Sequence, residues 1–364
     1  MHVAAARAAA LSTIFVLALS SCRVAGRATE IVEATCADRT RLICTGLYGP
    51  EAHAGERRIA AGIAGYEPGF RLWSDGLDKA RYVYLPPGTR IDTSDMNEWR
   101  FPIGTKLWKQ FSWRGRRIET RFLEKTAPET WRATTFVWNA DQSDAREQLD
   151  GKTVQLDGGH GAYEIPGQCD CERCHGGRSD HVLGFEALAL AAPGAKGLTL
   201  TQLVAEDRLT RVPPPAATAL PGGPLDQAAL GWLHMNCGVS CHNPNPAAGA
   251  SFAGLDLKLT ADGARDPRAT ATVRTAVNRP TTTLGFKAPD APKIRITPGH
   301  PRASAIYFRA SARTPALSMP PLATHLVDRE ALDTLDRWIV ALAGSADGQA
   351  TPRRAGQVSE ERAQ

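Results

Sequence analysis

Thr105-Lys-Leu-Trp-Lys-Gln-Phe-Ser-Trp113 alternates two sets of side chains, as an extended chain with two different faces does. Runs rich in β-branched and aromatic residues follow at Ile118–Leu123 and Trp131–Trp138. Upstream, Ala80–Leu85 has the same texture and ends at the turn signal Pro86-Pro-Gly88. These four runs predict neighbouring β-strands in the first half of the chain.

Tryptophan is concentrated in this β region. Six of the eight tryptophans lie between Trp73 and Trp138. Tryptophans on alternating strands pack in a core more often than they stack on a ligand such as a carbohydrate, which is the sharper alternative. We therefore expect residues 66–165 to form a compact β-sandwich or barrel with an aromatic core.

The second half of the chain has a helical pattern. Asp226 can cap a helical run that leads directly into Cys237, and Asp328 can cap a terminal helix. Four apolar residues of the terminal helix fall on one stripe, namely Leu332, Leu335, Ile339 and Leu342. Strands followed by helices predict an α+β multidomain fold, with a β-sandwich or barrel-like domain before a mostly α-helical region.

Changes in composition divide the 364 residues into parts. We expect a signal peptide over residues 1–21, an irregular lead-in over 22–65, the β-rich domain over 66–165, a segment with a proline-rich connector over 166–225, a helical domain over 226–343 and a disordered tail over 344–364. The net charge of +5 is modest, and no dense run of lysine and arginine is present. We therefore expect no nucleic-acid partner.

The N-terminus has the features of an export signal. Arg7 precedes an apolar stretch, Ala8–Ser20, that is too short to span a bilayer comfortably. The stretch ends in Leu19-Ser-Ser-Cys22, which resembles the lipobox of bacterial lipoproteins, where Cys22 would be acylated. A plain secretory signal cut near Ser21 is the alternative. The sequence predicts a protein of the cell envelope, on the periplasmic face and anchored to the membrane by lipid.

Cys171-Glu-Arg-Cys174-His175 is the first of two clusters of cysteine and histidine. It has the C-x-x-C-H spacing that attaches c-type haem, in which the two thiols add to the two haem vinyl groups and the histidine becomes the proximal iron ligand. The sequence therefore predicts attachment at Cys171 and Cys174 and ligation by His175. A distal site left open to a small ligand is one possibility. The residues that could fill it are His181, His160 and Met96.

Cys237-Gly-Val-Ser-Cys241-His242 is the second cluster and has three residues between its cysteines instead of two. Thiols at positions i and i+4 share a face of a helical turn, so two thioethers are feasible with a slight bulge. A single thioether is the alternative. Ser318-Met319-Pro-Pro321 follows before the terminal helix, and a soft thioether such as that of Met319 favours ferrous haem iron.

Export places the eight cysteines in an oxidising compartment, where thiols are paired, lipidated or bound to haem. Cys36 and Cys44 can close a short-loop disulfide. Cys169 is left over and is either free or competes with Cys171 as an attachment thiol. We favour Cys171 because it gives the standard spacing.

Phe101-Pro-Ile-Gly-Thr-Lys-Leu-Trp-Lys-Gln-Phe111, with Glu119-Thr-Arg121 and Leu233-His-Met-Asn-Cys237, resembles a family of exported bacterial diheme c-type cytochromes. In that family an F-P-x-G-T-x-x-x-K-x-F β-domain precedes two haem motifs. The order of helix, second cluster, M-P-P loop and terminal helix also looks like a class I cytochrome c domain. This resemblance implies that His242 is the proximal ligand and Met319 the distal ligand of the second haem.

These observations predict a diheme c-type cytochrome that carries electrons between redox partner proteins and holds two covalently attached haems. The alternative is a peroxidase-like haem enzyme that uses an open first haem. A zinc site of the four clustered cysteines is a third reading, against which export and Met319 argue.

Overall fold

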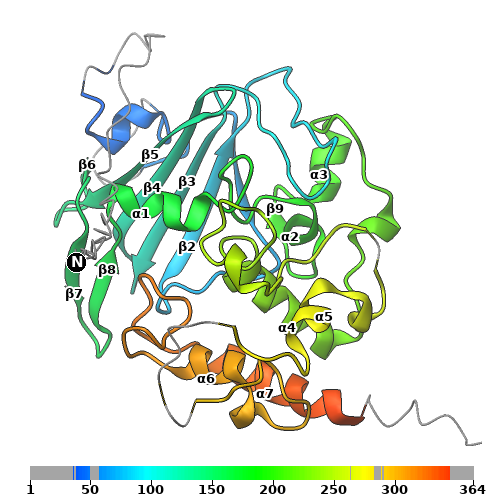
Figure 1. Ribbon diagram of the computed structural model, residues 1–364. Coiled ribbons are helices and arrows are strands. Elements are labelled where there is room, and N and C mark those ends of the chain that lie inside the picture. The colour runs from blue at the N-terminus through cyan, green and yellow to red at the C-terminus, as the bar shows by residue number, and fades with distance from the viewer. Residues whose placement is uncertain are drawn as a thin grey trace, which may run out of the picture. The chain divides into compact units, whose positions relative to one another are not determined.

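A seven-stranded antiparallel sheet dominates the first half of the structure, which is a computed structural model (Figure 1). The structure describes residues 36–344, except residues 37, 50–56, 263, 283–287, 289 and 290. The strand order across the sheet is β6-β5-β4-β3-β2-β1-β9. The strands are β1 (Ile63–Glu67), β2 (Asp78–Tyr84), β3 (Lys106–Trp113), β4 (Arg116–Ala127), β5 (Thr130–Trp138), β6 (Ala145–Glu147) and β9 (Lys196–Gly197), while β7 (Lys152–Leu156) and β8 (Gly161–Ile165) form a separate hairpin.

The alternating stretch at 105–113 forms β3, as the sequence predicts. A tight turn joins β3 to β4, and its two central residues, Arg114 and Gly115, both have positive φ (49° and 77°), which suits a two-residue hairpin turn. The pairing places Trp108 opposite Phe122. Because this register fixes which side chains share a face, the two faces of the sheet have different chemistry.

One face of the sheet is aromatic and is covered by the segment 41–49. Trp108, Phe122 and Phe136 pack there against Leu42 and Leu47, and all five are at most 1% exposed. The short 3₁₀ helix Leu42–Thr45 belongs to this cover, and Thr45 accepts a hydrogen bond from the Trp108 indole at 2.9 Å. Core packing is thus confirmed for tryptophans of the alternating strands.

The other face of the sheet packs on the β7–β8 hairpin and on helical segments. At one end, Phe111 packs against Tyr163 and Ile165 of the hairpin. At the other end, Leu107 joins a cluster that includes Phe185. Helix α1 packs against β5 (Figure 1). The helices beside this face are α1 (Gln168–His175), α2 (Ala187–Ala191) and α3 (Leu200–Ala205).

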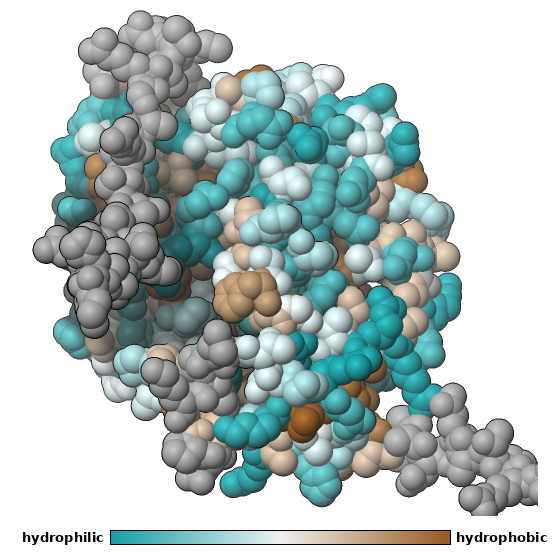
Figure 2. Space-filling model, in the orientation of Figure 1, coloured by the Kyte–Doolittle hydropathy of each residue, from teal (hydrophilic) through white to brown (hydrophobic). Residues whose placement is uncertain are grey.

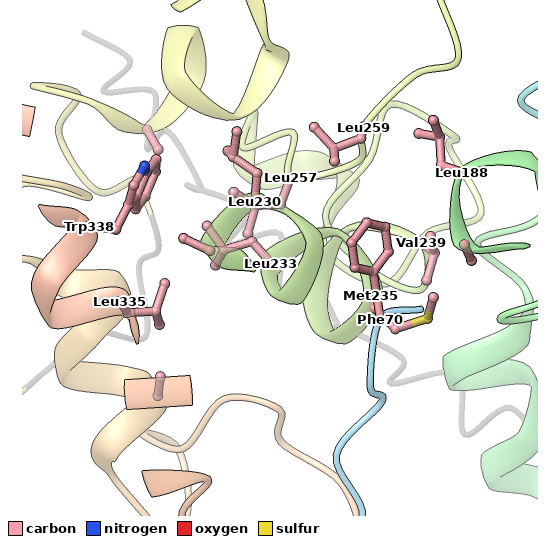
Figure 3. Packing of buried hydrophobic residues seen from close by; sticks show 14 of the residues in the cluster. Phe70, Leu188, Leu230, Leu233, Met235, Val239, Leu257, Leu259, Leu335 and Trp338 are labelled. Atoms are coloured by element: carbon pink, nitrogen blue, oxygen red, sulfur yellow. The ribbon is translucent and has the colours of Figure 1, made fainter. Parts of the chain in front are cut away.

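A second core lies between α4 and α7 (Figure 3). Leu230 and Leu233 of α4 pack with Leu335 and Trp338 of α7, and the stripe predicted for the terminal helix faces this core. Asp328 caps α7 by accepting from the backbone N–H of Ala331 at 3.1 Å, as predicted. The helices of this half are α4 (Pro224–Leu233), a π-helix (His234–Gly238), α5 (Ala271–Ala276), α6 (Ala305–Ser311) and α7 (Arg329–Gly344).

The predicted fold class is wrong on two points. Within the described residues, seven of the nine strands form one open sheet with ends at β6 and β9, and β7 and β8 form only a hairpin, so the region is not a sandwich or barrel. The region after residue 226 is not mostly helical, because α5 and α6 have only six and seven residues and irregular chain surrounds them. Prolines recur along this stretch, and proline ends helices because it lacks the N–H donor.

The sheet and the helices belong to one compact unit. Figure 2 shows small hydrophobic patches among hydrophilic residues on one face of the molecule. Within the described residues, no helix combines the length and the apolar character that crossing a membrane requires.

Candidate functional site

The two cysteine–histidine clusters contact each other, although 68 residues separate Arg173 from Cys241. The Sγ atom of Cys241 lies 3.9 Å from the carbonyl oxygen of Arg173. Close by, a Cβ atom on Gly177 would lie 2.0 Å from the carbonyl oxygen of Ser240, so only glycine permits this approach. The side-chain amide of Asn245 donates to the carbonyl oxygen of Gly177 at 3.3 Å. The structure therefore builds one site from both clusters.

The cysteines of the two clusters are free thiols, unlike the other described cysteines. Cys36 and Cys44 form the predicted disulfide. Cys169 is not a free thiol in the structure, so it does not compete with Cys171 as an attachment thiol. The free thiols in the described part of the chain belong to Cys171, Cys174, Cys237 and Cys241. These are the four thiols that the two motifs assign to haem.

Helix α1 carries the first cluster at its C-terminal end. The Nδ1 atom of His175 binds the carbonyl oxygen of His181, which leaves Nε2 available. Burial, followed by the nearby Lys109 charge, lowers the pKa of His175 to about 3. The imidazole is therefore neutral at pH 7 and offers a lone pair to a metal. His175 and Cys171 line one cavity of about 650 Å³.

The distal candidates proposed from the sequence do not line this first cavity. The Nδ1 atom of His181 lies 3.7 Å from Oε2 of Glu172, and its backbone carbonyl orients His175 instead. The Nε2 atom of His160 binds the carbonyl oxygen of Asp75 at 2.8 Å. Met96 packs at the edge of another core. His181 thus contributes to the site through its backbone, which the motif alone did not indicate.

The sheet closes the first cavity with a row of cations. Strand pairing places Lys109 of β3 opposite Arg81 of β2 on one side and opposite Arg121 of β4 on the other. These three residues and Lys79 line the cavity. Only Arg121 has a carboxylate partner in the described chain, since its Nη2 lies 2.7 Å from Oε1 of Glu119. Sequence reasoning missed this row because it exists only once the register is known.

Positive charge that is buried, as at Arg81, or half-buried, as at Lys109, is unfavourable without a counter-ion. Burial, and then the charges of Arg81 and Arg121, lower the pKa of Lys109 to about 7. Burial also lowers the pKa of Arg81, which is 7% exposed. The cavity therefore favours a ligand that brings negative charge, and haem carries two carboxylates.

The π-helix His234–Gly238 accommodates the irregular second cluster. The N–H groups of Cys241 and His242 both bind the carbonyl oxygen of Cys237, at 3.1 and 2.8 Å. A π-turn takes up one extra residue in a helix, which is what the longer spacing requires. Burial raises the pKa of the Cys237 thiol to about 12 and that of Cys241 to about 11. Both thiols stay protonated at pH 7 and both face one cavity.

The second cavity, of about 830 Å³, brings together Cys237, Cys241, His242 and Met319. Burial first, and then Arg309 and Arg295, lower the pKa of His242 to about 4, so its ring is neutral at pH 7. Its Nδ1 atom is buried and has no hydrogen-bond partner within the described residues.

Arg309 holds the chain that carries Met319. The Met319 N–H donates to the carbonyl oxygen of Arg309 at 3.0 Å. The Arg309 guanidinium donates to the carbonyl oxygens of Leu317 and Ala316 at 3.0 and 3.1 Å. These contacts fix the approach of Met319 to the cavity that His242 lines.

A buried ionic network centred on Glu186 links the chain segments next to the two clusters. Oε1 of Glu186 lies 2.5 Å from Nε2 of His234, and its Oε2 lies 2.8 Å from Nη1 of Arg178. Burial raises the pKa of Glu186, but Arg178 and His234 outweigh it and lower that pKa to about 2. Arg178 follows the first cluster and His234 precedes the second, so the network ties their supporting chains together.

Comparison with protein-family models, with curated proteins and with solved structures gives no match to this chain. Among the residues that the structure describes, no three side chains of His, Cys, Asp or Glu are placed to hold a metal ion together. Haem iron takes its equatorial ligands from the porphyrin and needs only axial ligands from the protein. The second cavity offers the two thiols of its cluster with the neutral His242, and the first offers Cys171 with the neutral His175, while Cys174 lies one helical turn along in the same cluster. These donors fit that requirement.

Proposed function

We propose that this chain is a diheme c-type cytochrome that carries electrons in the bacterial cell envelope. One observation carries the proposal. The four free thiols of the described chain are the two pairs of the Cys-His clusters, and each cluster contributes a thiol and its neutral histidine to the wall of a cavity. Bound haem would supply an iron centre that accepts and releases one electron.

In the first cavity, Cys171 and Cys174 would attach the haem and His175 would be its proximal ligand. The contact between His175 and the His181 carbonyl supports this role, because proximal histidines are oriented through their second ring nitrogen. The row of cations on the sheet would neutralise the haem carboxylates.

In the second cavity, Cys237 and Cys241 would attach the haem, with His242 and Met319 as axial ligands. The presence of Met319 in the same cavity wall supports this assignment. Histidine–methionine ligation raises the reduction potential relative to ligation by two nitrogens, because the thioether favours ferrous iron. This gives the second haem a role as the higher-potential centre.

The contact between the clusters supports transfer of electrons within the protein. Arg173, between the two attachment cysteines of α1, touches Cys241. Two haems attached at adjoining backbones would exchange electrons with each other and with redox partner proteins. Export and a lipid anchor at Cys22 complete the proposal; Cys22 lies outside the described residues, and its lipidation rests on the lipobox-like sequence.

Expression in a periplasm with a haem c maturation system tests the proposal. We expect mass spectrometry to show the mass of two covalent haems, and a pyridine haemochrome assay to count two. Cys171→Ala with Cys174→Ala should remove one haem, and Cys237→Ala with Cys241→Ala should remove the other. Protein without any covalent haem under these conditions would refute the assignment.

A further inference from the structure

The sheet side of the first cavity offers few groups that can ligate iron. Its described lining contains one histidine, His175, and no methionine. The remaining nitrogen donors with an accessible lone pair are the amines of Lys79 and Lys109, since arginine stays protonated. A second protein nitrogen ligand in this cavity would therefore come from a lysine.

The two lysines differ in what they contact. Nζ of Lys79 donates to the carbonyl oxygen of Leu72 and lies 5.5 Å from the centre of the Phe111 ring, and burial lowers the pKa of Lys79 well below its usual range as well. In the described part of the chain, no hydrogen bond or ion pair reaches Nζ of Lys109. Lys109 also lies at the centre of the cation row, between Arg81 and Arg121. Two neighbouring guanidinium groups repel a positive charge on Nζ of Lys109, so this environment favours the neutral form of the amine.

We infer that Nζ of Lys109 would be a second protein ligand of the first haem iron, in the cavity whose wall it shares with His175. The inference rests on the proposed attachment of haem at Cys171 and Cys174. Arg81, which has no carboxylate partner among the described residues, then remains to face a haem carboxylate.

This assignment gives the two centres different ligands. The first haem has histidine and lysine, and the second has histidine and methionine. A nitrogen base favours ferric iron relative to a thioether, so the first centre is the lower-potential one. The first haem is then closed to small ligands, which a peroxidase-like reaction would need to bind.

Lys109 could instead serve only as a charge partner of a haem carboxylate, and Lys109→Arg separates the two roles. The guanidinium of Lys109→Arg keeps the positive charge but does not ligate iron. Lys109→Ala removes both properties and leaves room for an added amine. Lys106→Ala is the matched control, because Lys106 lies on the same strand but on the opposite face.

The experiment uses holoprotein whose haem content is first counted. Electron paramagnetic resonance and near-infrared magnetic circular dichroism of the ferric protein then report spin state and axial ligands. We expect two low-spin haems in the unchanged protein and in Lys106→Ala. Lys109→Ala and Lys109→Arg should each convert one of the two to high spin, and added butylamine should restore the low-spin signal of Lys109→Ala.

Three results would overturn the inference. Two low-spin haems in Lys109→Arg would leave Lys109 only a charge role. A high-spin signal in Lys79→Ala but not in Lys109→Ala would move the ligand to Lys79. A first haem that is already high-spin in the unchanged protein would show an open site. In each of these three cases two covalent haems are still counted, so the proposed function stands and only the assignment of Lys109 fails. Absence of covalent haem would refute both the proposed function and the assignment of Lys109.

Discussion

The carbonyl oxygen of Arg173 lies 3.9 Å from the sulfur of Cys241, which joins two clusters that are far apart in the sequence. The contact is possible because Gly177 passes directly over Ser240 without a side chain. A glycine and a carbonyl oxygen thus hold the backbones of the two clusters next to each other.

Gly177→Ala should disturb this contact. The new Cβ would lie 2.0 Å from the carbonyl oxygen of Ser240, so the backbone must move. We expect the free energy of unfolding to fall by about 1–3 kcal/mol. Gly249→Ala is the control, since its Cβ would lie 3.8 Å from the carbonyl oxygen of Arg173, an ordinary contact. Urea unfolding measures both; equal stability of the two variants would contradict the role of Gly177.

Met319→Leu tests the second centre. Loss of the thioether removes the ligand that favours ferrous iron, so the midpoint potential of the second haem should fall by roughly 0.1 V. A potentiometric titration followed at the haem bands would resolve the two centres. Met96→Leu should leave both potentials unchanged, because Met96 lies in a core away from the second cavity. An unchanged titration of Met319→Leu would exclude Met319 as a ligand.

Local patterns of the sequence predicted the elements better than their assembly. Alternation at 105–113 marked β3, and the stripe around Leu335 and Ile339 marked the face of α7 that is buried. The sandwich or barrel was wrong because alternation tells only that a strand has two faces. What covers each face depends on tertiary packing. The segment 41–49 covers one face, and helices and the β7–β8 hairpin cover the other.

At the candidate site, too, the sequence predicted local features better than the way they come together. Motif spacing identified both clusters, and the structure brings Met319 and His242 to one cavity. The contact between the two clusters depends on chain segments that are distant in sequence. The row of cations through Lys109 depends on the strand register. His181, the first histidine after the first motif, does not line the first cavity, and its Nδ1 atom lies 3.7 Å from Oε2 of Glu172.

Glu186→Gln tests the network beneath the clusters. The carboxylate is buried between Arg178 and His234, and removing its charge leaves the buried guanidinium of Arg178 with only the more distant Glu98, 3.7 Å from Nε. We expect the free energy of unfolding at pH 7 to fall by about 3 kcal/mol, which chemical denaturation measures. Glu129→Gln is the control, because that carboxylate is exposed and its pair with Arg100 contributes little.

The acid dependence of stability should change in the same variant. The pKa of Glu186 is lowered from 4.5 to about 2 in the folded protein. Its contribution is therefore fully present above pH 4.5 and is lost as the pH falls toward 2. Glu186→Gln should flatten the decline of unfolding free energy in this window, while Glu129→Gln should follow the unchanged protein. Parallel declines in all three would show that Glu186 does not carry this dependence.

Asp180→Ala should weaken the support of the first cluster. Both carboxylate oxygens of Asp180 lie 2.7 Å from Nζ of Lys125, and the pair is about 5% exposed. Asp180 also accepts from the Trp131 indole at 2.8 Å and immediately precedes His181, whose carbonyl orients His175. Removing the Asp180 carboxylate leaves the buried ammonium of Lys125 without a counter-ion, so we expect the free energy of unfolding to fall by about 3–5 kcal/mol.

The matched control for Asp180→Ala is Asp207→Ala, whose pair with Arg90 is exposed and should contribute below about 1 kcal/mol. Urea denaturation of holoprotein compares the two, and magnetic circular dichroism follows the first haem. Because the His181 carbonyl loses its anchor, ligation by His175 should weaken in Asp180→Ala but not in Asp207→Ala. A stability loss with an unchanged first-haem spectrum would mean that His175 is held without help from Asp180.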